Sequence, residues 1–307
     1  MAESKIFPIP ARLNLAIAAT QVAALLTLLR LSAVVSGWGL AAVALGYGIA
    51  MNSAYAMLHE AQHGILHPNQ RVNEVTGAIL ALFFPAPFHL IRQGHLGHHL
   101  RNRSDDEAFD FYFEGESRVW RFLQLYGVLT GFFWCVIVLS NVFAVFFPSL
   151  LRPKAYSFDR TTTAMLSSFN PTFLPLVRIE ALAVVVLHAT LIWWWQIPLA
   201  HWFVTLAGFG VVWSAMQYVH HFGTERDVAK GALNLRTFPL LDLLWLNHNW
   251  HLHHHLRPTV PWLYLAEIDA GERKPRGNLL IAYLRMWRGP RLTNEHVENR
   301  YAGRLIH

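Results

Sequence analysis

Four long apolar stretches dominate the hydropathy pattern of the chain. They cover residues 13–29, 38–58, 173–195 and 199–219. Each approaches the ~20 residues that an α-helix needs to cross a bilayer. Short breaks at Gly37 and Pro198 separate the members of each pair, so the pattern predicts two transmembrane hairpins, at residues 13–58 and 173–219. A group of histidines follows each hairpin directly.

Two further apolar stretches, residues 75–91 and 127–147, have a less certain assignment, and two prolines interrupt the first of them. If all histidine groups face one compartment, each intervening segment must enter and leave the membrane on the same side. Both stretches are therefore predicted to be interfacial or re-entrant. Arg152, Lys154 and Arg160, which follow the second stretch, favour a return to the cytosol.

The composition agrees with a large surface facing lipid. The chain is 54% hydrophobic and 14% charged, with a mean hydropathy of +0.29, outside the usual range of soluble domains. Helix is expected throughout, because lipid offers no water to backbone groups. The fold class predicted is an all-α integral membrane protein, one domain over residues 1–307. It has four transmembrane helices, interfacial helices, and a cytosolic histidine-rich cap formed by residues 105–120 and the tail after Pro258.

The net charge of +6 and the pI near 9.7 do not indicate nucleic acid. The basic residues form no stripe interleaved with exposed aromatic residues, which argues against such a partner. A basic cluster in the tail could attract anionic membrane lipids or an acidic protein, or be a solvated tail that follows the positive-inside rule. Its members are Arg273, Lys274, Arg276, Arg285, Arg288 and Arg291.

Cysteine chemistry is excluded, because Cys135 is the single cysteine of the chain and has no partner for a disulfide or a thiolate metal site. The chain instead has 18 histidines, many of them clustered. His59 and His63 follow the first hairpin as HEAQH, and their spacing places both rings on one face of a helix. A metal ion could bind between them.

The other clusters repeat this helical spacing. HLGHH contributes His95, His98 and His99, and NWHLHHHLRP contributes His251, His254 and His255. The pair His220 and His221 directly follows the second hairpin. One such motif alone is usually structural, but several together beside a membrane would be costly polar groups without a shared role. A common metal centre explains the set.

The number of histidines indicates two ions with four or five ligands each. The candidate ligands are His59, His63, His95, His98, His99, His221, His251, His254 and His255. Imidazole suits zinc, copper, nickel and iron, so ligand type alone does not name the metal. Two redox-active irons beside lipid would fit activation of O2 against an unactivated C–H bond, which needs a strong oxidant.

The three motifs HEAQH, HLGHH and NWHLHHHLRP resemble the histidine boxes of the membrane fatty acid desaturase superfamily, over about residues 55–263. This superfamily includes acyl desaturases, hydroxylases and carotenoid ketolases. The resemblance implies two non-haem irons, O2 as co-substrate and a lipid or acyl-chain substrate. It also implies an external ferredoxin, rubredoxin or cytochrome-type electron donor, and histidine boxes on the cytoplasmic face.

The same comparison implies roles for neighbouring residues. His221 precedes a Gly-Thr element and takes the place of an additional ligand, whereas His220 and His253 stand where glutamate is common. Metal-bound histidines usually donate their second N–H to an acceptor, so nearby polar residues are candidates to orient them. These candidates are Asp105, Asp106, Asp110, His220, Asn247 and His248. A charged surface loop is the alternative reading of the three carboxylates.

Two functions from other classes compete. HEAQH also matches the HExxH motif of an intramembrane zinc protease, in which Glu60 would activate water, but this leaves the other clusters unexplained. A metal transporter would place ionisable groups within the spans rather than at their ends. Within the superfamily, fatty acyl desaturation is favoured, with hydroxylation and ketolation as alternatives, because the boxes do not encode how the oxidation ends.

Overall fold

The computed structural model describes residues 7–268 and 276–306. Arg273 and Lys274 of the basic tail lie outside the described residues. Four helices are long and apolar enough to cross a membrane, and bent helix pairs would raise the number to six if each were one span. The four are α1 (Ala11–Ser32), α2 (Trp38–Gln62), α8 (Leu174–Trp195) and α9 (Leu199–Val219). They form two hairpins at the predicted positions.

Each hairpin turns at a residue with positive φ. Gly37 has φ +54° before α2, and Gln196 has φ +53° after α8. The hairpins meet where α2 packs against α9. At this crossing a Cβ added to Gly208 would lie 2.5 Å from the Ala44 carbonyl oxygen, so only glycine permits the approach. This close crossing holds α2 and α9 against each other, and the histidines lie at the C-terminal ends of these two helices.

The two remaining apolar stretches form bent helix pairs. In the first pair, α3 (Gln70–Phe83) meets α4 (Phe88–Arg101) at 100°. In the second, α5 (Arg118–Thr130) meets α6 (Phe132–Phe146) at 88°. Prolines follow α3, and Gly131 with φ +93° joins α5 to α6. A re-entrant or interfacial placement of both pairs stays a prediction.

Short elements complete the described chain. The helices are α7 (Arg160–Ser167), α10 (Pro239–Leu244), α11 (His251–Leu256) and α12 (Leu279–Met286). The 3₁₀ turns are Asp105–Glu107, Pro148–Leu151, Pro153–Tyr156, Pro171–Phe173 and Trp262–Glu267. Two parallel strand pairs, β1 (Phe111–Tyr112) with β4 (Arg291–Leu292) and β2 (Leu235–Arg236) with β3 (Gly277–Asn278), add to the predicted all-α fold. They attach the C-terminal segment to the loops that carry polar residues.

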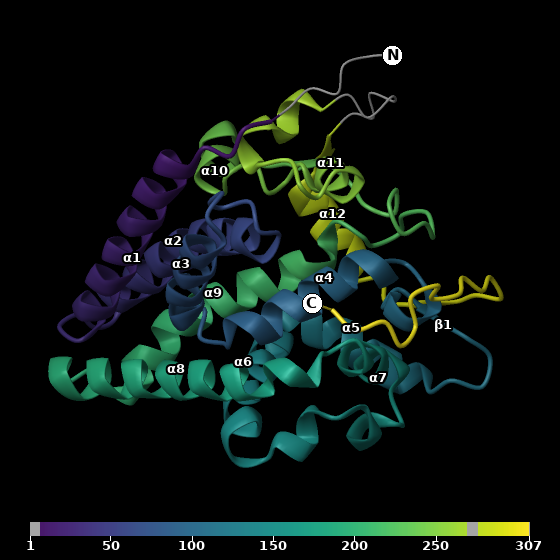
Figure 1. Ribbon diagram of the computed structural model, residues 1–307, viewed down its shortest axis with the longest axis horizontal. Coiled ribbons are helices and arrows are strands. Elements are labelled where there is room, and N and C mark those ends of the chain that lie inside the picture. Colours follow the sequence, from purple (N-terminus) through teal and green to yellow (C-terminus); the bar gives the residue numbers. More distant parts are fainter. Residues whose placement is uncertain (1–6, 269–275, 307) are drawn as a thin grey trace.

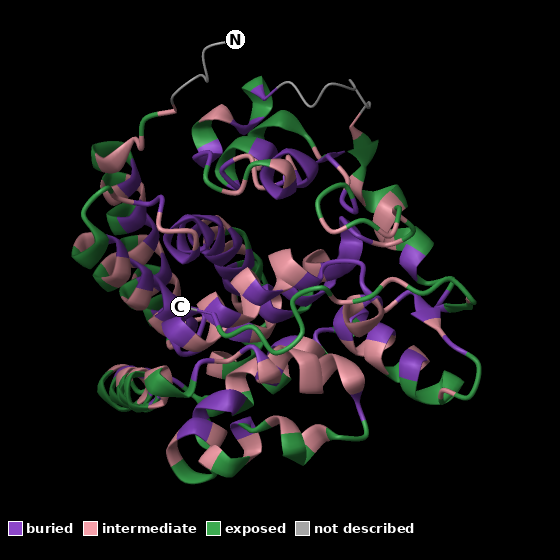
Figure 2. Cartoon of the chain, turned by 45° about the vertical axis from the view of Figure 1, so that its right-hand side comes forward, coloured by how far each residue is buried: buried purple, intermediate pink, exposed green. Residues whose placement is uncertain are grey.

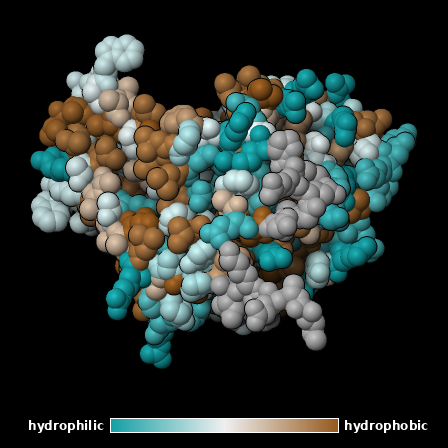
Figure 3. All heavy atoms as spheres, turned by 90° about the horizontal axis from the view of Figure 1, so that it is seen from above, coloured by the Kyte–Doolittle hydropathy of each residue, from teal (hydrophilic) through white to brown (hydrophobic). Residues whose placement is uncertain are grey.

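In Figure 1 the α1/α2 hairpin lies at the left, α8 runs along the lower part, and α10, α11 and α12 gather toward the top. Buried residues concentrate at the centre of the molecule, and the outer helix faces are exposed (Figure 2). Many exposed side chains are apolar. They include Trp38, 92% exposed, and Trp193 and Trp194 at the hairpin turns. Figure 3 shows apolar side chains toward the α1 side and hydrophilic ones toward the opposite side.

Candidate metal centre

The structure brings nine histidines together in two neighbouring groups. The first group contains His59, His63, His95, His99 and His254. The second contains His98, His221, His251 and His255. Within each group the candidate ligand nitrogens all lie within 4.8 Å of one another. The groups adjoin, since the rings of His99 and His255 stack with centroids 4.3 Å apart. These are the nine histidines that the sequence analysis selected.

Four segments supply these side chains. The end of α2 gives His59 and His63, and the turn after α9 gives His221. Helices α4 and α11 each contribute to both groups. On α4, His95 and His99 belong to the first group and His98 to the second. On α11 the division is reversed, since His254 belongs to the first group and His251 and His255 to the second. Each of these two histidine boxes is therefore shared between the groups.

The ring nitrogens converge as metal ligands do. Nε2 of His63 lies 2.7 Å from Nε2 of His95, and Nε2 of His254 lies 2.9 Å from Nε2 of His99. Nε2 of His59 is buried and has no hydrogen-bond partner among the described residues. A buried nitrogen without a partner is costly, and metal coordination removes that cost. The donor set therefore fits metal ions.

The protonation state and the orientation of the histidine rings also agree with metal binding. Burial holds the pKa of His251, His254 and His255 well below the usual range, so these rings are neutral and keep a free lone pair. Nδ1 of His221 donates a hydrogen bond to the Gly231 carbonyl oxygen at 2.8 Å. That bond leaves Nε2 of His221 facing His251, 3.1 Å away. Such a hydrogen bond on the far nitrogen fixes the tautomer that a metal requires.

Comparison with protein families decides the relationship. The family model described as fatty acid desaturase matches residues 35–287, which is most of the chain. The chain belongs to the fatty acid desaturase family. Enzymes of this family are oxidoreductases that act on lipids and have di-iron centres. No curated protein matches the chain.

One contact of this desaturase-family chain was missed by the sequence analysis. The Glu107 carboxylate accepts a hydrogen bond from Nδ1 of His98 and another from Nε of Arg101 at 3.2 Å. Burial alone would raise the pKa of Glu107, but the adjacent His98 ring and the Arg101 guanidinium hold that pKa below its usual range. The ionised carboxylate therefore orients the ring of His98 toward the second group.

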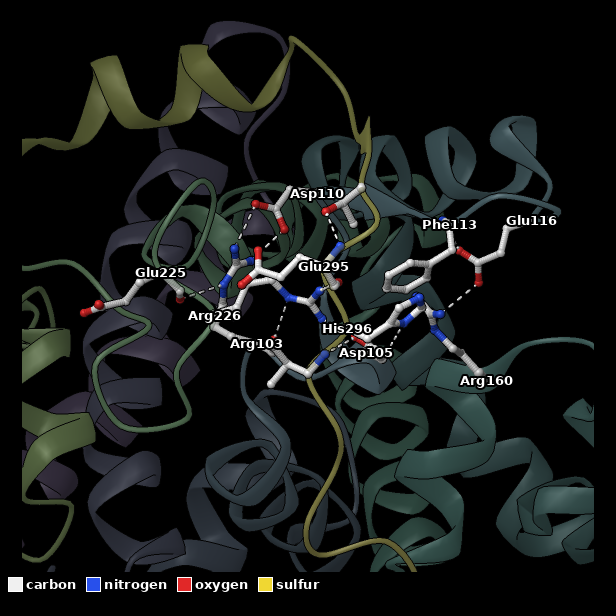
Figure 4. Close-up of polar contacts among 12 residues, drawn as sticks. Arg103, Asp105, Asp110, Phe113, Glu116, Arg160, Glu225, Arg226, Glu295 and His296 are labelled. Atoms are coloured by element: carbon white, nitrogen blue, oxygen red, sulfur yellow. Dashed lines mark hydrogen bonds and ion pairs between the residues drawn. The ribbon is translucent and has the colours of Figure 1, made fainter.

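Asp105 and Asp106, which the sequence analysis proposed for that role, bind elsewhere. Asp105 forms an ion pair with Arg226 and accepts a hydrogen bond from the Val297 backbone at 2.9 Å. Asp106 accepts from the Asn299 side chain at 2.8 Å. Among the described residues, neither carboxylate contacts a histidine of the two groups. Both attach the C-terminal segment to the loop after α4, and Figure 4 shows the Asp105 contacts.

Asp110 also turns away from the histidine rings. It pairs with the Arg103 guanidinium at 2.6 and 3.2 Å (Figure 4). It also accepts a hydrogen bond from the Tyr218 hydroxyl at 2.6 Å. Its second oxygen accepts from the Gly223 backbone N–H at 2.8 Å. Arg103 is fully buried and donates to the Thr224 carbonyl oxygen at 2.9 Å. This network joins the loop after α4 to the turn that carries His221.

His248 and His220 pack against the groups without belonging to either. The His248 ring lies 4.7 Å from that of His59 and 5.5 Å from that of His251. The His220 ring lies 4.7 Å from that of His251. Burial lowers the pKa of His248 to about 4 and that of His220 to about 3, so both rings are neutral. Asn247 instead donates to the carbonyl oxygen of Trp262 at 3.4 Å.

Glu60, the acid of the HExxH reading, points toward another part of the chain. Its carboxylate accepts a hydrogen bond from the Trp262 backbone N–H at 3.0 Å and is buried there. A metalloprotease needs this carboxylate beside a metal-bound water. The arrangement therefore favours a structural role for Glu60, in which it connects α2 to the segment after α11.

Proposed function

We propose that the chain is a membrane-bound di-iron oxidase that acts on an unactivated C–H bond of a lipid acyl chain, and that the reaction is desaturation. The observation that carries the proposal is the pair of adjoining, buried to half-buried histidine groups in a chain of the desaturase family. The first group would hold one iron through five histidines and the second would hold the other through four. Iron bound there would supply activation of O2, the co-substrate.

The side chains of the site have three roles in this proposal. Neutral rings would hold each ion, and contacts such as that of Glu107 with His98 would set the orientation of those rings. Five of the nine histidines are buried and the other four are half-buried, which limits the access of bulk water and would protect an oxidising centre from side reactions. Where the substrate methylene lies relative to the two groups would decide whether a double bond or a hydroxyl group results.

The proposed topology places both hairpins across the membrane and the histidine groups on the cytoplasmic face, with residues 1–307 acting as one domain. The exposed tryptophans at the hairpin turns support it, because tryptophan is enriched where helices leave the bilayer. These turns lie at the ends of α2 and α9 opposite to the histidines. Electrons would come from a separate ferredoxin, rubredoxin or cytochrome-type donor.

Metal analysis coupled to lipid mass spectrometry tests this proposal. The purified full chain should contain about two irons, the number that two histidine groups can hold. Lipids of an expressing host should include species that have lost two hydrogen atoms. Species that have gained one oxygen atom would identify a hydroxylase. Zinc in place of iron, with unchanged lipids, would refute the oxidase and favour the intramembrane zinc protease.

Glu107→Gln should weaken metal retention. Glutamine keeps the size of the side chain but loses the charge that orients His98, and loss of such an outer contact typically costs ten- to a hundredfold in metal affinity or activity. The rate of iron loss to a chelator measures the effect. Asp106→Asn is the matched control, because Asp106 lies in the same 3₁₀ turn and contacts Asn299. Equal iron loss in both variants would contradict the orienting role.

A further inference from the structure

A hollow of about 440 Å³ lies behind the second histidine group, between the 224–235 loop and α12. Its apolar lining includes Leu233, Leu252 and Ile281. Lys230 and Arg285 also line it, and both are exposed. Neither cation forms an ion pair within the described part of the chain, and Glu225 is the one carboxylate of the described lining. An apolar cavity edged by two cations suits an amphipathic anion.

The helices beside the hollow expose apolar side chains. Strand β2 pairs with β3, so α10 and α12, which follow these strands, begin close together. Leu240 and Leu243 of α10 are 63% and 59% exposed, and Leu280 and Leu284 of α12 are 64% and 57% exposed. These exposed apolar side chains of the two helices are here called the α10/α12 face, and α12 also carries the exposed cation Arg285. Apolar residues beside basic ones are typical of helices that lie in the surface of an anionic bilayer.

The position of α12 in the fold agrees with a location at the membrane surface. Met286 is fully buried and packs in one cluster with Tyr218 and Val219, the last residues of α9. Helix α12 therefore lies at the level where the proposed transmembrane helix α9 ends. The hollow consequently opens at the depth of lipid head groups rather than in bulk solvent.

The wall of the hollow also holds the candidate ligands. The Gly231 carbonyl oxygen, next to Lys230, accepts the hydrogen bond from Nδ1 of His221 at 2.8 Å. Asn234, another lining residue, accepts from the backbone N–H groups of Leu252 at 3.0 Å and His253 at 3.3 Å. One loop therefore separates the hollow from the second histidine group.

We propose that this hollow binds the anionic head group of a bilayer lipid, and that the lipid is the substrate class of the enzyme. The substrate would be an acyl lipid that carries a phosphate or carboxylate and comes from the membrane itself. Its assignment as substrate rests on the proposed function, whereas the binding site does not. Charge complementarity with Lys230 and Arg285 and the exposed α10/α12 face carry the proposal.

Lipid binding to the detergent-solubilised full chain tests the site. The probes are phosphatidylglycerol, which is anionic, and phosphatidylcholine, which is zwitterionic; both carry the same fluorescent acyl chain and differ only in the head group. We expect tighter binding of phosphatidylglycerol, and little competition from inorganic phosphate, because phosphate lacks the acyl chain. Equal binding of both lipids would overturn the proposal, and so would full displacement by phosphate, which would indicate a site for a free anion.

Charge-reversal variants test whether Lys230 and Arg285 form the lipid-binding site. Each cation beside an anionic lipid surface contributes about 1 kcal/mol, or about fivefold in affinity, so Lys230→Glu with Arg285→Glu should weaken phosphatidylglycerol binding by roughly 30-fold or more. Arg300→Glu, at an exposed arginine outside the hollow, is the matched control and should change little. An equal response of both variants would refute the site.

Iron content and lipid oxidation separate this proposal from the proposed function. Unchanged iron content in the double variant shows that the fold and the histidine groups are intact. Wild-type binding of phosphatidylglycerol without any oxidised lipid would refute the oxidase while the binding site stands. Oxidised lipid in the wild type, with equal binding of the two probes, would refute the binding site while the proposed oxidase stands.

Discussion

His254→Ala is expected to remove one iron and to abolish lipid oxidation. Nε2 of His254 lies 2.9 Å from Nε2 of His99, and its ring lies 4.4 Å from that of His59 and 4.6 Å from that of His63. It is the one member of the first group that comes from α11. Loss of an outer contact costs ten- to a hundredfold, so loss of a ligand should cost more than a hundredfold in turnover. Iron content and product formation in membranes measure both effects.

The matched control is His67→Ala. His67 accepts a hydrogen bond from the Asn69 backbone N–H at 2.9 Å and belongs to neither group. This variant should keep about two irons and wild-type turnover, which shows that removal of a histidine as such is tolerated. A His254→Ala protein with full iron content and full activity would exclude His254 from the ligand set.

Arg103→Met is expected to destabilise the fold more than any surface change. The Arg103 guanidinium is fully buried, pairs with Asp110 at 2.6 Å and donates to the Tyr218 hydroxyl at 2.7 Å. Methionine would leave the Asp110 carboxylate buried without its cation. Removal of one partner from a buried pair costs about 3–5 kcal/mol. The thermal midpoint of the detergent-solubilised protein should fall clearly below that of the wild type.

An exposed arginine provides the comparison for this variant. Arg118 lies over the Phe122 ring at the start of α5, and Arg118→Met should change stability by about 0.5 kcal/mol or less. The network also supports the turn after α9, because Asp110 accepts from the Gly223 N–H at 2.8 Å. Arg103→Met should therefore lose iron faster at temperatures where it is still folded. Equal thermal midpoints for the two variants would contradict the structural role of Arg103.

The hairpins were predictable because lipid imposes a simple length rule on a chain. The stretch at residues 38–58 corresponds to α2, which extends four residues further to Gln62 and includes His59. The pattern indicated re-entrant or interfacial segments but could not give the angles of the bends after α3 and α5. These depend on prolines, on Gly131 and on packing against Val211, whose Cγ2 would lie 3.0 Å from a Cβ added to Gly131.

Helical spacing identified the histidines but could not divide them between two groups. His95, His98 and His99 share one face of α4 by sequence, and only the positions of α2, α9 and α11 assign His98 to a different group. Which carboxylate contacts a ligand histidine also depends on the tertiary structure. Four carboxylates lie within residues 105–110, after the second box. The 3₁₀ turn at Asp105–Glu107 directs Glu107 alone of the four to a histidine of the groups.

The division of α4 between the two groups has a mechanical consequence. Successive residues on a helix differ by about 100° of rotation and 1.5 Å of rise, values fixed by backbone hydrogen bonds. Because His98 and His99 are neighbours on one such helix and belong to different groups, the geometry of α4 constrains the interval between the two histidine groups. A tilt of α4, such as a thicker or thinner bilayer would impose, would therefore move its histidines in both groups together.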